Sequence, residues 1–205
     1  MQMSLHVLPE KAARQYILES ARKEIDLNGI LGMRLSAVAQ GANVSIPLIS
    51  RHFGGRDGLL AQVLGDWYAE FVQSYQSMVD AWLDSAETVT LEQFALLSPK
   101  PSNPEYRKAR EFRLQVLATA IENRLLRDRV SQITTQTHEW MLGVIRRGKA
   151  KMPLRDRYFD DRIFSLLLFN TMYVFTDLVE GISVGDEEYS QFLVNLIRAS
   201  SEFNR

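Results

Sequence analysis

Apolar residues recur at steps of three and four along most of this 205-residue chain. Such spacing places side chains on one face of an α-helix, whereas a half-buried strand would show an apolar residue at every second position. No convincing alternating stretch and no internal repeat interrupts the helical pattern. The sequence therefore predicts an all-α protein.

Breaks in the periodicity divide the chain into helices. Asn28-Gly29 supplies a left-handed stop for the first helix, and Gly54-Gly55 separates the short third helix from a long fourth one. Residues 98–104, which contain three prolines, form the only segment with the composition of a loop. The expected helices are, in order, 10–27, 35–42, 46–53, 56–84, 89–97, 105–126, 128–149, 159–180 and 186–203.

Residues 35–53 have the spacing of a helix-turn-helix, in which two short helices are separated by three or four residues. The turn falls at Asn43, and asparagine is among the few non-glycine residues that tolerate a positive φ. Val44 can fill the angle between the two helices. Ser45 is placed to cap the second helix, whose N–H groups and side chains would then face phosphates and bases. The pattern predicts a DNA-binding function.

Over roughly residues 10–64 the chain resembles the TetR family of bacterial repressors. The family pattern appears, with matched spacing, as Gly29, Val38-Ala39, Ala42-Asn43-Val44-Ser45, His52-Phe53 and Arg56-Asp57-Gly58-Leu59-Leu60. The resemblance implies a three-helix DNA-binding head over residues 1–55 and a larger helical ligand-binding and dimerisation domain over residues 56–205. It also implies a homodimeric repressor that a small-molecule effector releases from a palindromic double-stranded DNA operator.

Three positions depart from the family pattern. Met33 replaces the usual threonine before the second helix, Asn43 replaces the turn glycine, and Ser50 replaces the tyrosine of the recognition helix. Phosphate anchoring must therefore differ from that of the family. Arg34, next to the missing threonine, could supply a charge-assisted replacement.

The recognition helix and its flanks supply the candidate DNA contacts. Arg51 carries a guanidinium fork that suits guanine or phosphate, although a solvated arginine would look the same in sequence. His52 could instead pack at the helix end, and Arg56 could cap a helix terminus or pair with Asp57. Lys11 and Arg14 could contact the DNA backbone or form a solvated face. The predicted DNA-binding residues are Arg34, Ser45, Ile46, Pro47, Ser50, Arg51, His52 and Arg56.

The helix expected over residues 159–180 is apolar nearly all round, so one face needs a partner besides its own core. The last helix carries a matching stripe, and two such helices could meet their symmetry mates in a four-helix interface, as the resemblance implies. The alternative is a helix buried in the core of a monomer. The predicted dimer-interface residues are Phe169, Tyr173, Tyr189, Phe192, Leu193 and Leu196.

Asn170 and Asp177 lie two turns apart on that apolar helix and need partners if buried. They could orient a ligand or hydrogen-bond across a dimer, and the sequence does not decide between these roles. The aromatic candidates could equally be plain core. An apolar, aromatic-rich domain favours a hydrophobic effector. The predicted ligand-binding residues are Phe112, Gln115, Trp140, Asn170, Tyr173 and Asp177.

The sequence offers nothing for catalysis. The chain has no cysteine, and none of its three histidines has an acidic residue three positions before it, as a helical di-metal site would require. Phosphate-binding glycine loops, zinc motifs and nucleophile elbows are absent as well. We therefore expect no enzyme activity, no cofactor and no metal.

The chain is expected to act in the cytoplasm, because its N-terminus lacks the pattern of a signal peptide. Its densest apolar stretch, residues 163–175, is shorter than the ~20 residues that span a bilayer. No membrane partner is expected. The net charge of -1 argues against general coating of nucleic acids, so any DNA binding should depend on a local surface.

Overall fold

The computed structural model describes residues 10–95, 97, 104–161, 164–165 and 186–202. Within these residues every regular element is helical, which confirms the all-α prediction. The chain forms two compact units. Unit 1 comprises Met1–Ala69 and Gln115–Ser131, and unit 2 comprises Glu70–Leu114 and Gln132–Arg205. These units do not coincide with a boundary at residue 55, because the helix α4 (Arg56–Ser85) contributes to both.

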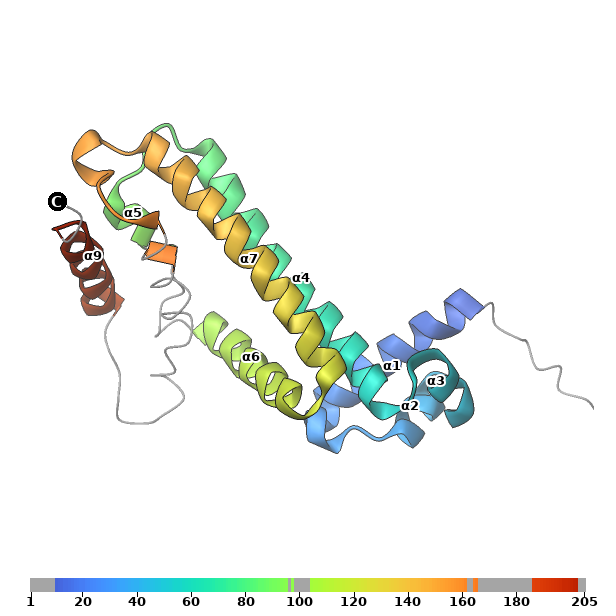
Figure 1. Ribbon diagram of the computed structural model, residues 1–205. Coiled ribbons are helices and arrows are strands. Elements are labelled where there is room, and N and C mark those ends of the chain that lie inside the picture. Colours follow the sequence, from blue (N-terminus) through green and yellow to red (C-terminus); the bar gives the residue numbers. More distant parts are fainter. Residues whose placement is uncertain (1–9, 96, 98–103, 162–163, 166–185, 203–205) are drawn as a thin grey trace, which may run out of the picture. The chain divides into compact units, whose positions relative to one another are not determined.

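Unit 1 contains the three helices predicted for the DNA-binding head: α1 (Glu10–Gly32), α2 (Leu35–Gly41) and α3 (Ile46–Phe53). They pack on one another (Figure 1) around a core that includes Ile17, Val38 and Ile49. Gly29 has φ 72° and ψ 169°, so α1 breaks there even though a further helical turn follows. The predicted stop at Asn28-Gly29 is thus confirmed as a kink within α1.

The corner between α6 (Pro104–Glu122) and α7 (Arg124–Lys151) also belongs to unit 1. The sequence placed this break near Arg127, and that prediction is wrong by about one turn. Asn123 forms the actual corner, because its Oδ1 accepts a hydrogen bond of 3.0 Å from the Leu126 N–H at the start of α7. Its Nδ2 donates 2.8 Å to the carbonyl of Asp57, so the corner is tied to the start of α4. An asparagine before a helix is a typical N-cap.

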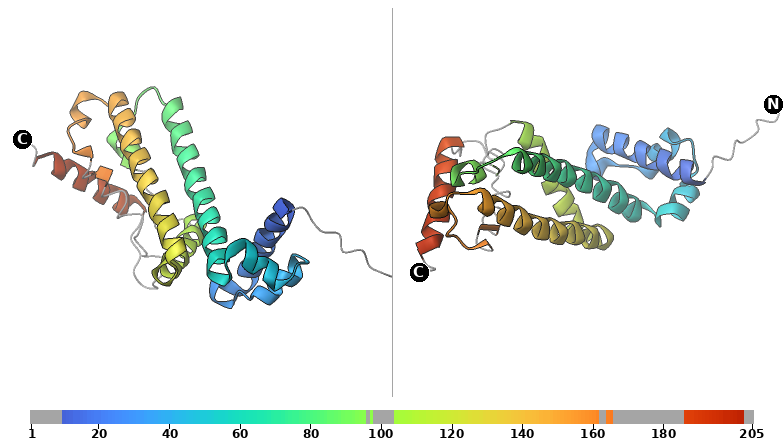
Figure 2. Two further views of the ribbon diagram at one scale, coloured as in Figure 1. Left: turned by 45° about the vertical axis from the view of Figure 1, so that its right-hand side comes forward. Right: turned by 90° about the horizontal axis from the view of Figure 1, so that it is seen from above.

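In unit 2 the second half of α4 runs antiparallel beside α7, as Figures 1 and 2 both show. Trp140 on α7 donates a hydrogen bond of 3.0 Å to Asp80 on α4, and Lys151 reaches the carbonyls of Leu83 and Ala86. Arg147 pairs with Asp80 as well. Hydrogen bonds and an ion pair therefore join the end of α4 to the second half of α7.

The short helix α5 (Leu91–Ala95) and the last helix α9 (Asp186–Glu202) pack together in unit 2. Thr90 and Gln93 exchange backbone and side-chain hydrogen bonds at the start of α5, which is the pattern of a capping box. Glu92 on α5 pairs with Arg198 on α9. A hydrogen bond from its own backbone N–H, aided by Arg198, lowers the pKa of the Glu92 carboxyl below its ordinary value.

Most of the helix predicted over residues 159–180 lies outside the described residues, and so does the loop over residues 98–103. Phe164 is described; it is buried and stacks on Phe94 with ring centroids 5.4 Å apart. Across the described part of the chain, no helix has the length and apolar character needed to cross a membrane.

Candidate DNA-binding site

The recognition helix α3 is anchored by one side and exposed on the other. Ile49 is its buried residue, at 0% exposure, whereas Ile46 is 43% exposed one turn earlier. The other exposed positions lie on the same short helix or at its start. They are Ser45, Pro47, Ser50 and Arg51. The structure thus presents five of the predicted DNA contacts on the exposed side of this helix.

The turn before α3 has the backbone that its sequence predicts. Asn43 adopts a φ of 53°, and among the described residues it is the only non-glycine residue with a positive φ. The Val44 N–H donates to the Ala39 carbonyl at 2.9 Å, which closes the turn onto α2. An asparagine in place of glycine is therefore compatible with the helix-turn-helix geometry.

Ser45 occupies the N-cap position of α3, with φ −85° and ψ 151°, as predicted. Its carbonyl accepts hydrogen bonds from the N–H groups of Leu48 and Ile49. Its hydroxyl makes no capping hydrogen bond, contrary to what the usual role of an N-cap serine led us to expect. The hydroxyl is consequently available to an external acceptor or donor at the N-terminus of the helix, where an anion is favoured.

Arg51 is the basic residue on the exposed side of α3. Among the described residues it has neither an ion pair nor a side-chain hydrogen bond. Arg34, just before α2, is 73% exposed in its side chain and lies 3.9 Å from the buried carboxylate of Glu24. Both guanidinium groups are accessible, but Arg34 is partly neutralised by its acidic neighbour.

Arg56 makes internal contacts of the kind expected for the helix-capping role that the sequence left open beside DNA contact. Its guanidinium donates hydrogen bonds to the carbonyls of Ile30 at 3.0 Å and Met33 at 3.4 Å. These carbonyls follow the kink at Gly29, so Arg56 fastens the start of α4 to the segment between α1 and α2. A DNA phosphate would have to compete with these two bonds.

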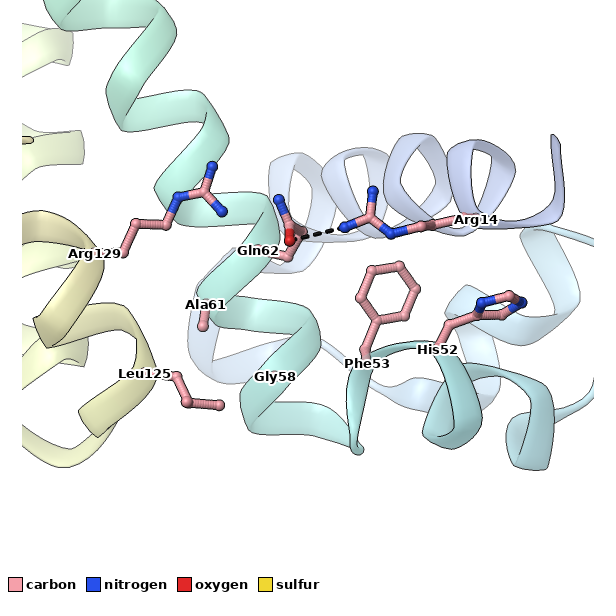
Figure 3. Close-up of a pocket in the computed structure, with 8 residues that line it drawn as sticks. All are labelled: Arg14, His52, Phe53, Gly58, Ala61, Gln62, Leu125 and Arg129. Atoms are coloured by element: carbon pink, nitrogen blue, oxygen red, sulfur yellow. Dashed lines mark hydrogen bonds between the residues drawn. The ribbon is translucent and has the colours of Figure 1, made fainter. Parts of the chain in front are cut away.

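Arg14 is likewise turned inward. Its guanidinium lies over the ring of Phe53 at 5.2 Å from the centroid and donates a hydrogen bond of 2.8 Å to the Gln62 side chain (Figure 3). Phe53 is the last residue of the recognition helix, and His52 packs against it with ring centroids 6.2 Å apart. This cation–π contact therefore fixes the end of α3 against α1 and α4.

The Arg14 contact continues as a chain of polar side chains. Gln62 donates to Asp66 at 2.7 Å, and Asp66 pairs with Arg129 on α7. Gly65 makes room for this pair, because a Cβ at that position would overlap the Arg129 side chain. We call Arg14, Gln62, Asp66 and Arg129 the polar relay. It joins the end of the recognition helix to the first turns of α7, all within unit 1.

The sequence did not reveal the polar relay or the cap at Asn123. Arg14 was singled out, but Gln62, Asp66 and Arg129 have ordinary polar positions on helix surfaces, and nothing in their spacing shows that they meet. The contacts of Arg14 with Gln62 and of Arg129 with Asp66 join residues more than 45 positions apart, and only Gln62 and Asp66 are four positions apart on one helix. A usable signal existed for Asn123 alone, since an asparagine directly before a helical run is a standard N-cap.

The predicted ligand residues do not come together in the described structure. Gln115 lines a pocket of about 600 Å³ in unit 1. Trp140 instead packs against the core of unit 2, edge-to-face with Tyr75. Phe112 is half-buried on the unit 2 part of α6. The other three candidates, Asn170, Tyr173 and Asp177, lie outside the described residues.

The predicted dimer residues on α9 differ in their surroundings. Phe192 is 56% exposed, whereas its neighbour Leu193 is 2% exposed and belongs to the core of its own chain. Leu196 is half-buried. Phe169 and Tyr173 lie outside the described residues, as does the side chain of Tyr189.

Residues 17–63 match the sequence profile of the family described as "Bacterial regulatory proteins, tetR family". The helix-turn-helix segment is thus similar to that of the TetR family. A curated relative, the HTH-type transcriptional regulator BetI of Burkholderia thailandensis, is 35% identical over 72 residues. That match covers 33% of this chain and 37% of BetI, so it spans little more than a third of the relative's length. The matched family profile lies in the N-terminal part of the chain.

Solved structures extend the likeness in fold to nearly the whole chain. A Rhodococcus sp. protein described as a TetR-family transcriptional regulator has a TM-score of 0.58 at 20% identity, over 93% of this chain and 99% of its own. FadR of Bacillus subtilis, solved with stearoyl-CoA, has a TM-score of 0.52 at 17% identity, over 90% and 97%. At these identities the comparison shows the fold, an N-terminal helix-turn-helix domain with a larger helical domain.

Proposed function

We propose that this chain is a sequence-specific DNA-binding transcriptional regulator that binds a palindromic operator as a homodimer and is released from it by a small molecule. The observation that carries the proposal is the exposed side of α3, which presents Ser45, Ile46, Ser50 and an Arg51 that has no ion pair among the described residues. It lies in a segment with the TetR family profile. A DNA-binding helix of this kind favours a regulatory function over a catalytic one. A chromosomal DNA target favours a cytoplasmic location.

Direct readout requires side chains that reach base edges in the major groove. Arg14 on α1 and Arg56 on α4 make hydrogen bonds within unit 1, so Arg51 on α3 is the principal basic candidate for base contact. The Ser45 hydroxyl and the N-terminus of α3 are available to phosphate. Ile46, exposed on the first turn, is suited to an apolar contact with a thymine methyl group. The proposed contact set is therefore smaller than the one predicted from sequence.

Release from the operator by an effector requires that ligand binding lower the affinity of the chain for DNA. FadR, of similar fold, has been solved with stearoyl-CoA, which shows that the fold of that protein accommodates a small ligand. We propose an effector for this chain too, bound among helices of the larger domain, with Phe112, Trp140, Asn170, Tyr173 and Asp177 as candidates. The hydrophobic effector inferred from composition stays a proposal.

A homodimer would present two recognition helices to two half-sites about 34–36 Å apart, or a multiple of that distance. We propose that α9 contributes to the interface, because Phe192 leaves a large aromatic side chain on its exposed face. Phe169, Tyr173, Tyr189 and Leu196 remain candidates beside it. The buried Leu193 would support this face from within its own chain.

Arg51→Ala should weaken specific DNA binding by about 1–3 kcal/mol, because a guanidinium that pairs with a base contributes roughly that discrimination. Lys11→Ala is the matched control, since Lys11 is an exposed cation on α1 rather than on the recognition helix. It should reduce affinity mainly through the salt-dependent attraction of the DNA backbone. Fluorescence anisotropy at several salt concentrations, with a selected operator and a scrambled duplex, measures both effects.

An unchanged operator affinity for Arg51→Ala at every salt concentration would remove Arg51 from the site. If both variants weakened operator and scrambled duplex equally, α3 would be contributing charge and not sequence readout. If the unaltered chain bound the selected operator no more tightly than the scrambled duplex, the proposed function itself would be overturned.

A further inference from the structure

Unit 1 contains a pocket of about 600 Å³ that none of the proposed DNA contacts occupies, apart from the inward-turned Arg56. It is formed by the end of α1, the start of α4 and the end of α6. Its volume lies within the usual range for small-molecule sites, about 300–1,000 Å³. The space is therefore sufficient for a small ligand.

The pocket has an apolar floor. Leu60 and Ile30 line it and are almost fully buried, at 2% and 6% exposure, while Leu31 is 95% exposed. Ala118 on α6 adds a small side chain to the wall. An exposed leucine beside two buried apolar residues leaves apolar surface that a ligand can cover, which is favourable by the hydrophobic effect.

Two carboxylates stand at the same pocket, Asp57 on the first turn of α4 and Glu122 at the end of α6. Among the described residues neither carboxylate has an ion pair or a side-chain hydrogen bond. The single cationic side chain in the lining is Arg56, and its guanidinium is already bonded to the carbonyls of Ile30 and Met33. With two carboxylates and one guanidinium, the lining has a net negative charge, and neither carboxylate is ion-paired within the described residues.

The backbone at Asp57 brings these two groups to one place. The Asn123 side chain donates a hydrogen bond of 2.8 Å to the Asp57 carbonyl, and Glu122 is the residue before Asn123. Asp57 and Glu122 therefore lie at one junction, where this hydrogen bond joins the start of α4 to the end of α6. A ligand that satisfied both charges would need a cationic group attached to an apolar body.

We propose that this pocket binds a small amphipathic cation, with its apolar body over Leu60, Ile30 and Leu31 and its cationic group between Asp57 and Glu122. The pocket also adjoins the kink at Gly29 and the carbonyl held by Arg56, so a ligand there contacts the segment that leads from α1 into α2. Only an effect of the ligand on DNA binding through this segment rests on the proposed function. Binding itself does not.

Calorimetric titration of the full chain without DNA tests the site, with octyltrimethylammonium as the probe. Octanoate and octanol, which share its chain but not its charge, are the matched ligands. We expect saturable binding of the cation alone. Asp57→Asn with Glu122→Gln should weaken it by about tenfold, because partly exposed ion pairs each contribute up to about a threefold to fivefold effect.

Glu87→Gln is the control variant, since Glu87 is an exposed carboxylate of unit 2 and should leave the affinity unchanged. Ala118→Phe provides an independent arm, because it fills the pocket from an exposed helix position and should abolish binding without altering either charge. Circular dichroism confirms that each variant is folded.

Absence of saturable binding, equal binding of octanoate, or full affinity in the double variant or in Ala118→Phe would each overturn the site. DNA affinity is measured separately, with and without the probe. A chain that binds the cation but no operator would contradict the proposed function and leave the pocket standing. A chain that binds operator but no cation would contradict the ligand site and leave the proposed function standing.

Discussion

Ile49→Ala should destabilise the helix-turn-helix head by about 2–5 kcal/mol, because truncating a fully buried isoleucine removes apolar contacts and leaves a cavity. Ile49 is 0% exposed and is the buried residue of α3, so its loss frees the recognition helix from its support. Hydrogen exchange followed by mass spectrometry should show faster exchange in α1, α2 and α3. DNA binding should be lost with the structure.

Ile46→Ala is the matched control, since it makes the same change one turn earlier on the same helix at a position that is 43% exposed. Its effect on stability should stay within about 0.5 kcal/mol, as for most surface substitutions. A reduced operator affinity with unchanged hydrogen exchange would assign Ile46 to the DNA interface. Equal destabilisation by the two variants would contradict the orientation of α3.

Leu193→Glu should unfold the part of unit 2 that contains α9, and should not simply produce a folded monomer. Leu193 is 2% exposed within the core of unit 2, whose other members include Phe94 on α5. An unpaired carboxylate in such a position costs several kcal/mol. Thermal unfolding monitored by circular dichroism should show a marked loss of stability.

Phe192→Glu changes the adjacent residue, which is 56% exposed, and should leave the chain folded. If α9 lies in the dimer interface, sedimentation should show monomers that retain the helical spectrum and lose specific operator binding, because the two half-site contacts are then no longer linked. A well-folded Phe192→Glu dimer would remove this face from the interface. A fully stable Leu193→Glu variant would contradict the packing of α9.

The helix-turn-helix could be predicted from sequence almost to the residue, because its determinants are local. Asn43 supplies the positive φ, Ser45 occupies the N-cap position, and α3 covers Ile46–Phe53 as expected. Helix α4 also begins at Arg56 as predicted, directly after the Gly54-Gly55 break. Each boundary depends on the backbone preference of one or two residues.

The side-chain partners could not be predicted in the same way, because they depend on which surfaces meet. Arg56 looks like a DNA contact in sequence but binds carbonyls more than 20 positions earlier. Leu193 and Phe192 are both apolar residues of one helical stripe, and only the packing of the unit 2 core separates the buried one from the exposed one. The break at Asn123 was missed because the apolar periodicity continues across it.

The most direct test of the proposed regulator function is to let the full chain select bound fragments from a pool of random duplexes. Two identical recognition helices related by a two-fold axis should enrich a motif with dyad symmetry, whose half-sites lie about one helical turn, or a multiple of it, apart. Arg51→Ala should lose or relax positions within each half-site. Enrichment of no motif, or of a motif without dyad symmetry that Arg51→Ala leaves unchanged, would contradict the account.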